Sequence, residues 1–169
     1  MNFIVAVDNN YAIGKNNDLL YSLPTDMKYF RQTTLNKVVV MGLNTLLSFP
    51  NQKPLKNRTN IVLSGSNKDF KCENATVVYD LDSLFEELKK YDTDEVFVIG
   101  GASVYNLMMP YCKYAYITKI NAEKPADVFI NNIEKQDSWK LIKESEKYFE
   151  NDLEFTFQVY ENLDIKKYN

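Results

Sequence analysis

Residues 96–105 read VFVIGGASVY, which is the pattern of a buried strand followed by a tight turn and a helix. The apolar residues 96–99 do not alternate with polar ones, as is typical of a strand covered on both faces. Gly100 and Gly101 allow backbone conformations that other residues disfavour, and they let a ligand approach the chain closely. The helix predicted over residues 102–109 would present free N–H groups to a phosphate. A tight turn without any ligand explains the glycine pair equally well, because the dinucleotide-binding spacing of glycines is absent.

The alternation of strand and helix continues on both sides of this stretch. Unalternating apolar segments predict buried strands at residues 3–7, 38–41, 60–63, 76–78, 96–99 and 115–120. Helical spacing predicts helices over residues 24–32, 81–91 and 102–109, the first capped by Thr25 and the second carrying Ser83 and Glu86 in capping-box positions. Residues 139–148 and 153–160 alternate apolar and polar side chains around a predicted hairpin loop at residues 150–152. The sequence therefore predicts one α/β domain over residues 1–169, with a largely parallel sheet and an antiparallel C-terminal ribbon.

The composition is that of an ordinary globular domain. Of 169 residues, 45% are hydrophobic and 25% are charged, and a chain of this length buries roughly 70% of its unfolded surface. The net charge of −3 and the pI near 5.1 argue against a nucleic-acid partner. No apolar run approaches the roughly 20 residues of a membrane span, and no basic leader precedes the first strand. We therefore expect a cytoplasmic protein in which Cys72 and Cys112 are free thiols.

The chain contains no histidine. This excludes the usual general base, the triad hydrolases and almost every zinc site, so we expect no metal ion. Acid–base chemistry must then use carboxylates, tyrosine, lysine or water. Asp26 is the leading candidate, because it shares a helix face with Met27 and Phe30, where loss of water would raise its pKa. The alternative is that Asp26 only complements the helix dipole.

Three further features each have two interpretations. Residues 38–45, VVVMGLNT, form a second strand–glycine–helix junction, in which Asn44 or Thr45 is either a simple cap or also a phosphate donor. Two such junctions at one sheet edge would suit a ligand with a pyrophosphate. Residues 11–21 form a long irregular segment, which is either a lid or a mobile connector. Arg58 is either a solvated surface residue or a fork for a substrate carboxylate.

Several short motifs follow one another along essentially the whole chain: Ile13-Gly14, Leu23-Pro24-x-Asp26, Phe30, Thr34-Leu35-Asn36-Lys37, Val40-Met41-Gly42-x-x-Thr45, Pro54-Leu55-x-x-Arg58-x-Asn60-Ile61-Val62-Leu63-Ser64, Val98-Ile99-Gly100-Gly101-x-x-Val104-Tyr105, Thr118-Lys119-Ile120 and Phe155-x-Phe157. In this order and spacing they resemble the dihydrofolate reductase family. The resemblance implies an eight-stranded, mostly parallel mixed sheet with an antiparallel C-terminal strand and about four flanking helices.

The resemblance also implies an activity, the NADPH-dependent reduction of dihydrofolate to tetrahydrofolate in one-carbon metabolism. The protein would be a monomer that also binds antifolate inhibitors. Asp26 would hold the pteridine by paired hydrogen bonds, Thr118 would hydrogen-bond that carboxylate, and Tyr21 would belong to a closing lid over residues 13–23. Water admitted near Asp26 would protonate the pteridine N5, and the nicotinamide would deliver the hydride.

Two sets of ligand contacts follow from the same resemblance. The substrate would contact Ile4, Ala6, Met27, Phe30, Leu55, Arg58, Ile99 and Tyr105, with Arg58 binding the glutamate α-carboxylate. The cofactor would contact Ala6, Ile13, Gly14, Gly42, Leu43, Asn44, Thr45, Leu63, Ser64, Gly65, Ile99, Gly100, Gly101, Ala102, Ser103, Val104 and Tyr105.

Some positions depart from the family pattern. Tyr21 and Leu20 stand where the family usually has tryptophan and proline, so we expect altered lid behaviour rather than loss of activity. Leu43, Ser103 and Gly65 stand where arginine, arginine and serine are common near the cofactor phosphates. NADH is therefore an alternative cofactor, unless Lys68 supplies the missing charge.

Two rival functions are compatible with parts of the pattern. One is a riboflavin-pathway reductase, which shares the sheet but reduces a ribosylamino-pyrimidine. The other is a catalytically silent folate- or nucleotide-binding protein. Asp26 on the first predicted helix and Arg58 after Pro54-Leu55 favour folate, and turnover of dihydrofolate would exclude the silent binder.

Overall fold

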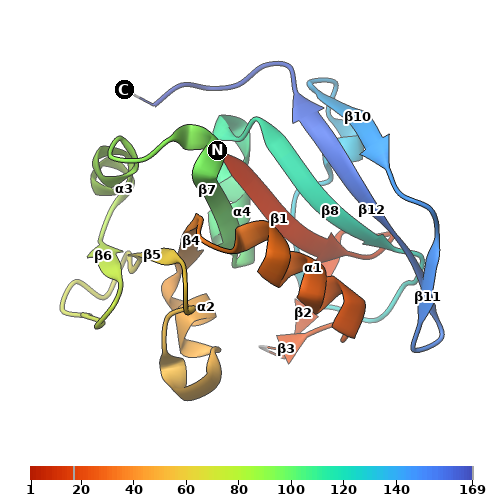
Figure 1. Ribbon diagram of the computed structural model, residues 1–169, viewed down its shortest axis with the longest axis horizontal. Helices are drawn as coiled ribbons and strands as arrows, with labels where there is room; N and C mark the ends of the chain where they lie inside the picture. Colours follow the sequence, from red (N-terminus) through yellow and green to blue (C-terminus); the bar gives the residue numbers. More distant parts are fainter. Residues whose placement is uncertain (17, 169) are drawn as a thin grey trace.

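The computed structural model describes residues 1–16 and 18–168 and shows a large sheet with helices on both faces (Figure 1). Asn17, within the predicted lid, and Asn169, the last residue of the predicted domain, lie outside the described residues. The main sheet has the strand order β10-β12-β8-β1-β7-β4-β5-β6, with β11 also paired to β12. Its strands are β1 (Asn2–Val7), β4 (Val38–Gly42), β5 (Thr59–Leu63), β6 (Thr76–Val78), β7 (Val96–Gly100), β8 (Tyr114–Ile120), β10 (Trp139–Glu144), β11 (Tyr148–Glu150) and β12 (Leu153–Asn162).

The six strands from β8 to β6 run parallel to one another. Alternate residues of these strands enter two cores, so that Val38 and Val40 pack on one face while Val39 and Met41 pack on the other. Helices α3 (Leu81–Leu88) and α4 (Ala102–Met108) cover the first face, and α1 (Pro24–Thr34) and α2 (Leu43–Leu47) cover the second (Figure 1). A strand covered on both sides needs no polar face, which explains the unalternating apolar segments. The predicted parallel strands and the α/β class are confirmed.

Four short 3₁₀ helices complete the connections: η1 (Pro50–Gln52), η2 (Thr93–Glu95), η3 (Met109–Tyr111) and η4 (Ile133–Lys135).

The C-terminal ribbon is antiparallel, as predicted, but its strands have different bounds. β12 pairs with β8 on one side and with β10 and β11 on the other. The strand predicted over residues 139–148 is split, because Ser145 leaves the strand conformation and binds Phe157 through its backbone N–H and its Oγ. The hairpin turn consists of Asn151 and Asp152, whose φ angles of 52° and 61° fit a tight two-residue turn. Glu150 is therefore the last residue of β11 and not part of the loop.

Three predicted helix caps are wrong. Pro24 occupies the first helical position of α1, so the cap is Leu23, and the Thr25 side chain binds Glu150 instead. Asp80 caps α3 by accepting a hydrogen bond from the Ser83 backbone N–H at 2.7 Å, which makes Ser83 a helix residue and removes the predicted capping box.

The N-terminus of α2 differs in the same way. Gly42 is its cap residue, with no side-chain cap bond, so neither Asn44 nor Thr45 caps the helix.

The segment predicted as irregular, residues 11–21, contains two short strands. β2 (Ala12–Lys15) pairs with β3 (Asp18–Leu19) and with β9 (Val128–Phe129) in a separate three-stranded sheet. The β2–β9 pairing joins residues more than 100 positions apart, and although the β2–β3 pairing is local, two- to four-residue strands leave little pattern in the sequence. This small sheet was therefore not predicted from the sequence.

Both cysteines are free. Cys112 is buried, and burial raises its pKa to about 12, whereas Cys72 is partly exposed. In the parts of the chain that the structure describes, no helix is both long enough and apolar enough to cross a lipid bilayer.

Candidate active site

The carboxyl ends of four parallel strands meet at one edge of the sheet, where β1, β7, β4 and β5 are successive neighbours. Met41 at the end of β4 pairs with Gly100 at the end of β7, after a register shift that leaves Ile99 as a bulge. Thr45 in α2 places its Oγ1 3.4 Å from where a Cβ on Gly100 would lie, and 3.5 Å from the equivalent position on Gly101. The two predicted glycine junctions therefore lie side by side. Such a crevice position is where α/β sheets bind ligands.

Glycine suits the two junctions for different reasons. Gly100 has a φ of 131°, a conformation that residues with a side chain rarely adopt, and its peptide bond to Gly101 is cis. At Gly42 a Cβ would come within 3.1 Å of Cγ2 of Val104, in the first turn of α4. A side chain at position 42 would therefore require Val104 to move by a few tenths of an ångström.

Replacing Gly100 with alanine is expected to cost about 1–3 kcal/mol of stability through backbone strain. The new Cβ would also meet Thr45 Oγ1 and Tyr105 Cε2 at 3.4 Å. Gly65 is the matched control, because its φ of 59° is also positive but no atom lies within 4 Å of its Cβ position. Gly65→Ala should cost only about 1 kcal/mol. Urea unfolding of both variants checks this expectation, and equal losses would show that the packing around Gly100 is loose.

Asp26 lies half-buried in the first turn of α1, facing β8. The Oγ1 of Thr118 donates a hydrogen bond to Asp26 Oδ1 at 2.5 Å. Burial raises the pKa of Asp26, the bond from Thr118 opposes that rise, and the nearby Glu150 carboxylate adds to it. Burial and then the Asp26 charge raise the pKa of Tyr105, whose ring also lies 3.4 Å from the Cβ position of Gly100. Tyr105 thus lies against the double-glycine turn and also feels the charge of the Asp26 carboxylate.

Arg58 is held at the entry to β5 by four hydrogen bonds. Its Nε and Nη2 both donate to Thr34 Oγ1 at 3.2 Å, its Nη1 donates to the Lys56 carbonyl and its Nη2 to the Arg31 carbonyl. Burial, and then the charge of Arg31, lower the pKa of Arg58. Among the described residues it forms no ion pair with a carboxylate. Four of the five N–H groups of Arg58 donate to these acceptors, which leaves one for a ligand. A bidentate contact needs two N–H groups, so it would replace one of the 3.2 Å bonds to Thr34.

Comparison with known proteins agrees with this geometry. The family model described as dihydrofolate reductase matches residues 1–162. The chain belongs to the dihydrofolate reductase family. It is 35% identical over 169 residues to the dihydrofolate reductase of Bacillus subtilis strain 168, covering 99% of this chain and 97% of that one. It is also 35% identical to the enzyme of Rattus norvegicus, covering 97% and 98%.

A solved structure supports the same assignment. The dihydrofolate reductase from Enterococcus faecalis complexed with NADP(H) and RAB-propyl matches with a TM-score of 0.84 and 29% sequence identity, covering 96% of both chains. The predicted family and the predicted fold are confirmed.

The predicted substrate contacts of this reductase lie in two groups. Ile4 and Ile99 are buried and pack in one core with the half-buried Phe30 and Leu55, whereas Ala6 packs beside Tyr21. Tyr105 is buried and its hydroxyl donates to the Ile4 carbonyl at 2.7 Å. The sequence pattern placed Met27 on an inward face, and this is wrong. The Met27 side chain is 53% exposed, because it lies on the outer side of the first turn of α1.

The predicted cofactor contacts gather where β1, β4, β5 and β7 end and where α2 and α4 begin, together with Ile13 and Gly14 of β2. Two of these residues already contact other parts of the reductase. Val104 is buried against the core, and Ser64 donates its hydroxyl to the Asn67 carbonyl and its backbone N–H to the Val78 carbonyl. Asn44, Gly65 and Ser103 are exposed.

Asp8 of the reductase is a residue that the sequence reasoning missed. It is fully buried and accepts hydrogen bonds from the backbone N–H groups of Asn10 and Ala12 and, at 2.9 Å, from the Tyr21 hydroxyl. The Lys124 ammonium lies 4.7 Å from the centre of the Tyr21 ring. The tyrosine that replaces the usual tryptophan therefore ties the end of the predicted lid to β1. An acid directly after a buried strand is the signal that could have indicated it.

Glu150 is the second residue that was missed, since it was assigned to a loop. In the structure its carboxylate accepts two hydrogen bonds from Thr25 beside Asp26. No group of three or more acidic or cysteine side chains in the described part of the chain is arranged to hold a metal ion.

Proposed function

We propose that this reductase transfers a hydride from NADPH to 7,8-dihydrofolate and so forms tetrahydrofolate. The observation that supports it best is the half-buried Asp26 carboxylate, held by Thr118 and sharing Tyr105 as a neighbour with the double-glycine turn. A carboxylate near the carboxyl ends of β1 and β7 is well placed to orient a flat heterocycle beside a second ligand seated on the glycines.

Asp26 is proposed to bind the pteridine through its amino group and a ring N–H, in a paired, charge-assisted contact. The Thr118 hydroxyl occupies Oδ1 from the β8 side, which fixes the plane of the carboxylate. Reduction also needs a proton at N5 of the pteridine. Because its pKa is raised, Asp26 binds a proton more readily than an exposed aspartate does. We propose that water near Asp26 delivers that proton, with Tyr21 in the lid limiting access of bulk solvent.

The rest of the substrate is proposed to extend from Asp26 toward Arg58. Phe30 and Leu55 lie in the same apolar cluster as Ile4 and Ile99, and they provide a continuous apolar path along α1. Met27 is exposed, so a ligand could cover it. Arg58 stands beyond this path, with a cation not paired to any carboxylate among the described residues. A glutamate α-carboxylate has the charge and shape to bind there.

The cofactor is proposed to lie across the two glycine junctions. The fit rests on the two junctions lying side by side at the carboxyl ends of β4 and β7, where the glycines leave the main chain without side chains and Thr45 Oγ1 lies 3.4 Å from the Cβ position of Gly100, so that backbone and hydroxyl groups can bind a ligand. Bound there, NADPH would supply the hydride. Leu43, Asn44, Gly101, Ala102 and Ser103 would line the phosphates, with Ile13, Gly14, Leu63, Ser64 and Gly65 around them.

Coenzyme choice depends on the cations near the ribose and the phosphates. The exposed Lys68 could approach a ribose phosphate, but it already faces Asp80, whose pKa is lowered by its hydrogen bonds with Ser83 and, to a lesser extent, by Lys68. Positions 43 and 103 carry leucine and serine instead of arginine. Among the residues predicted to lie near the cofactor phosphates, Lys68 is therefore the cation that is left. We propose NADPH as the physiological cofactor, with NADH as the comparison.

The test is turnover followed by loss of absorbance at the nicotinamide band. With purified protein, the absorbance should fall only when dihydrofolate and the reduced cofactor are both present, and NADPH should give a lower KM than NADH. Binding of both ligands without absorbance loss would identify a silent binder. Turnover of a ribosylamino-pyrimidine in place of dihydrofolate would identify the riboflavin-pathway reaction.

Three further expectations also stay proposals. They are one folding domain over residues 1–169, a monomer, and a location in the cytoplasm. Size-exclusion chromatography with light scattering should give the 19.7 kDa of a single chain.

A further inference from the structure

The N-terminus of α1 has no cap of its own. Its cap residue is Leu23, whose side chain cannot accept a hydrogen bond, and the first helical residue is Pro24, which has no N–H. The Met27 N–H closes the first turn onto the Leu23 carbonyl at 3.0 Å. The Thr25 N–H therefore needs an acceptor from elsewhere in the chain, and this same turn carries Asp26.

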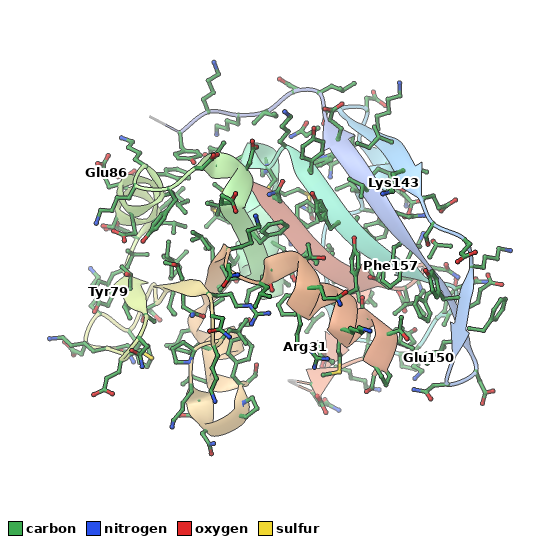
Figure 2. All side chains as sticks on the ribbon, in the orientation of Figure 1. Arg31, Tyr79, Glu86, Lys143, Glu150 and Phe157 are labelled. Atoms are coloured by element: carbon green, nitrogen blue, oxygen red, sulfur yellow. The ribbon has the colours of Figure 1, made fainter. Side chains whose placement is uncertain are left out.

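Glu150 supplies that acceptor from the other end of the sequence. Its Oε1 accepts from the Thr25 N–H at 3.0 Å and its Oε2 accepts from the Thr25 hydroxyl at 2.6 Å. A carboxylate at this position also complements the partial positive charge of the helix N-terminus. Figure 2 shows Glu150 on the β11–β12 hairpin, next to α1.

The hairpin holds both sides of the bend before α1. The tight turn at Asn151 and Asp152 fixes Glu150 opposite Leu153 in the β11–β12 ladder. From that turn Asn151 Nδ2 donates to the Ser22 carbonyl at 3.1 Å. One short hairpin therefore contacts the last residues of the predicted lid and the first turn of the helix.

The groups that face Asp26 come from four elements. Thr118 from β8 donates to its carboxylate, and Tyr29 from α1 and Tyr105 from α4 are neutral neighbours whose pKa values are raised, first by burial. Glu150 from β11 is the acidic member of this group, and its charge adds to the rise in the pKa of Asp26 that burial begins. Glu150 thus acts on Asp26 through the position of the helix turn and through charge.

We propose that Glu150 is a positioning residue of this reductase, which fixes the first turn of α1 through Thr25 and so sets the place of the Asp26 carboxylate. The inference rests on the role proposed above for Asp26. Glu150 itself touches neither of the proposed ligands.

The test compares three variants by the single-turnover rate of hydride transfer across pH. Glu150→Gln keeps both contacts, because its amide oxygen accepts from the Thr25 N–H and its amide group donates to the Thr25 hydroxyl, but it removes the charge. Its maximal rate should stay within about 2-fold of wild type, while the fall in rate with rising pH should occur at lower pH, since the pKa of Asp26 loses one cause of its rise. Glu150→Ala loses the contacts and the charge, and its maximal rate should fall roughly 10-fold as the turn shifts.

Glu146→Gln is the matched control. Glu146 is an exposed acid in the same ribbon, and among the described residues its carboxylate forms no salt bridge and no hydrogen bond with α1. It should leave both the rate and the pH profile unchanged. A maximal rate of Glu150→Ala that coincides with that of Glu146→Gln would overturn the inference, even if Glu150→Ala melts at a lower temperature, since a purely structural role moves stability alone.

Asp26→Asn, measured alongside, separates this inference from the proposed function. If Asp26→Asn keeps near-wild-type turnover, the role of Asp26 fails and the inference fails with it. If Asp26→Asn is impaired but both Glu150 variants match the control, only the positioning role fails.

Discussion

Replacing Asp26 with asparagine is expected to lower kcat at neutral pH by about 10²–10⁴-fold, the range typical of a group that assists proton transfer. Asparagine keeps an oxygen to accept the hydrogen bond from Thr118, so the side chain should stay in place. It loses the negative charge and one acceptor for the pteridine. Binding of dihydrofolate should therefore weaken but remain measurable, and the loss should appear mainly in the hydride-transfer rate.

The measurement is single-turnover hydride transfer between pH 5 and pH 9, with binding followed by quenching of protein fluorescence. Lower pH should partly rescue the variant, because solution acid can then protonate N5 without help from Asp26. A substrate that is already protonated at N5 should give the same rescue. Near-wild-type turnover at neutral pH would refute the role of Asp26.

The same variant should be more stable than wild type at neutral pH. Burial raises the folded-state pKa of Asp26 above its unfolded value, so the protonated carboxyl favours folding at acid pH and this advantage is lost as pH rises through the folded-state pKa. At neutral pH the wild type must keep a half-buried charge that asparagine does not carry. The melting temperature of Asp26→Asn should exceed that of wild type at pH 8, and the difference should shrink toward pH 4. A trade of stability for activity is common at catalytic sites.

Replacing Arg58 with alanine is expected to weaken dihydrofolate binding by about 2–3 kcal/mol, the low end of the range for losing one member of a buried ion pair. This corresponds to roughly 30- to 150-fold in Kd. The low end applies because Arg58 is only half-buried and four of its five N–H groups already bind the protein. Affinity for NADPH should not change, since the proposed cofactor contacts lie at the opposite, carboxyl ends of the strands.

Two controls sharpen this second experiment. Arg58→Lys keeps the charge but cannot bind the Arg31 carbonyl, the Lys56 carbonyl and Thr34 together, so it should recover only part of the affinity. A dihydropteridine without the glutamate tail should bind wild type and Arg58→Ala equally. If Arg58→Ala weakens the tailless ligand or NADPH as much as dihydrofolate, the arginine does not bind the carboxylate.

The parallel part of the sheet could be predicted because its signal is local. In β4 and β7 every residue from Val38 to Met41 and from Val96 to Gly100 is buried, and continuous burial leaves a continuous apolar run in the sequence. The glycine junctions at Gly42 and Gly100 were visible for the same reason, since each follows directly on such a run.

The parts that could not be predicted depend on contacts between distant residues. Glu150 and Thr25 are 125 positions apart, and nothing near either residue in the sequence indicates the pairing. The Thr118–Asp26 contact spans 92 positions and was expected only through the family resemblance. By contrast, the wrong cap at Thr25 was avoidable, because proline favours the first helical position and so assigns the cap to Leu23.

Strand β8 is a seam in the sheet, with parallel pairing to β1 on one side and antiparallel pairing to β12 on the other. Most of the proposed coenzyme contacts lie on the parallel side of β8. Asp26, which would orient the pteridine, is instead held by Thr118 of β8 and, through Thr25, by Glu150 of the β11–β12 hairpin. The two ligands would thus be recognised largely by different parts of the chain, which meet at Ala6, Ile99 and Tyr105, so changes far from these shared residues should combine almost additively.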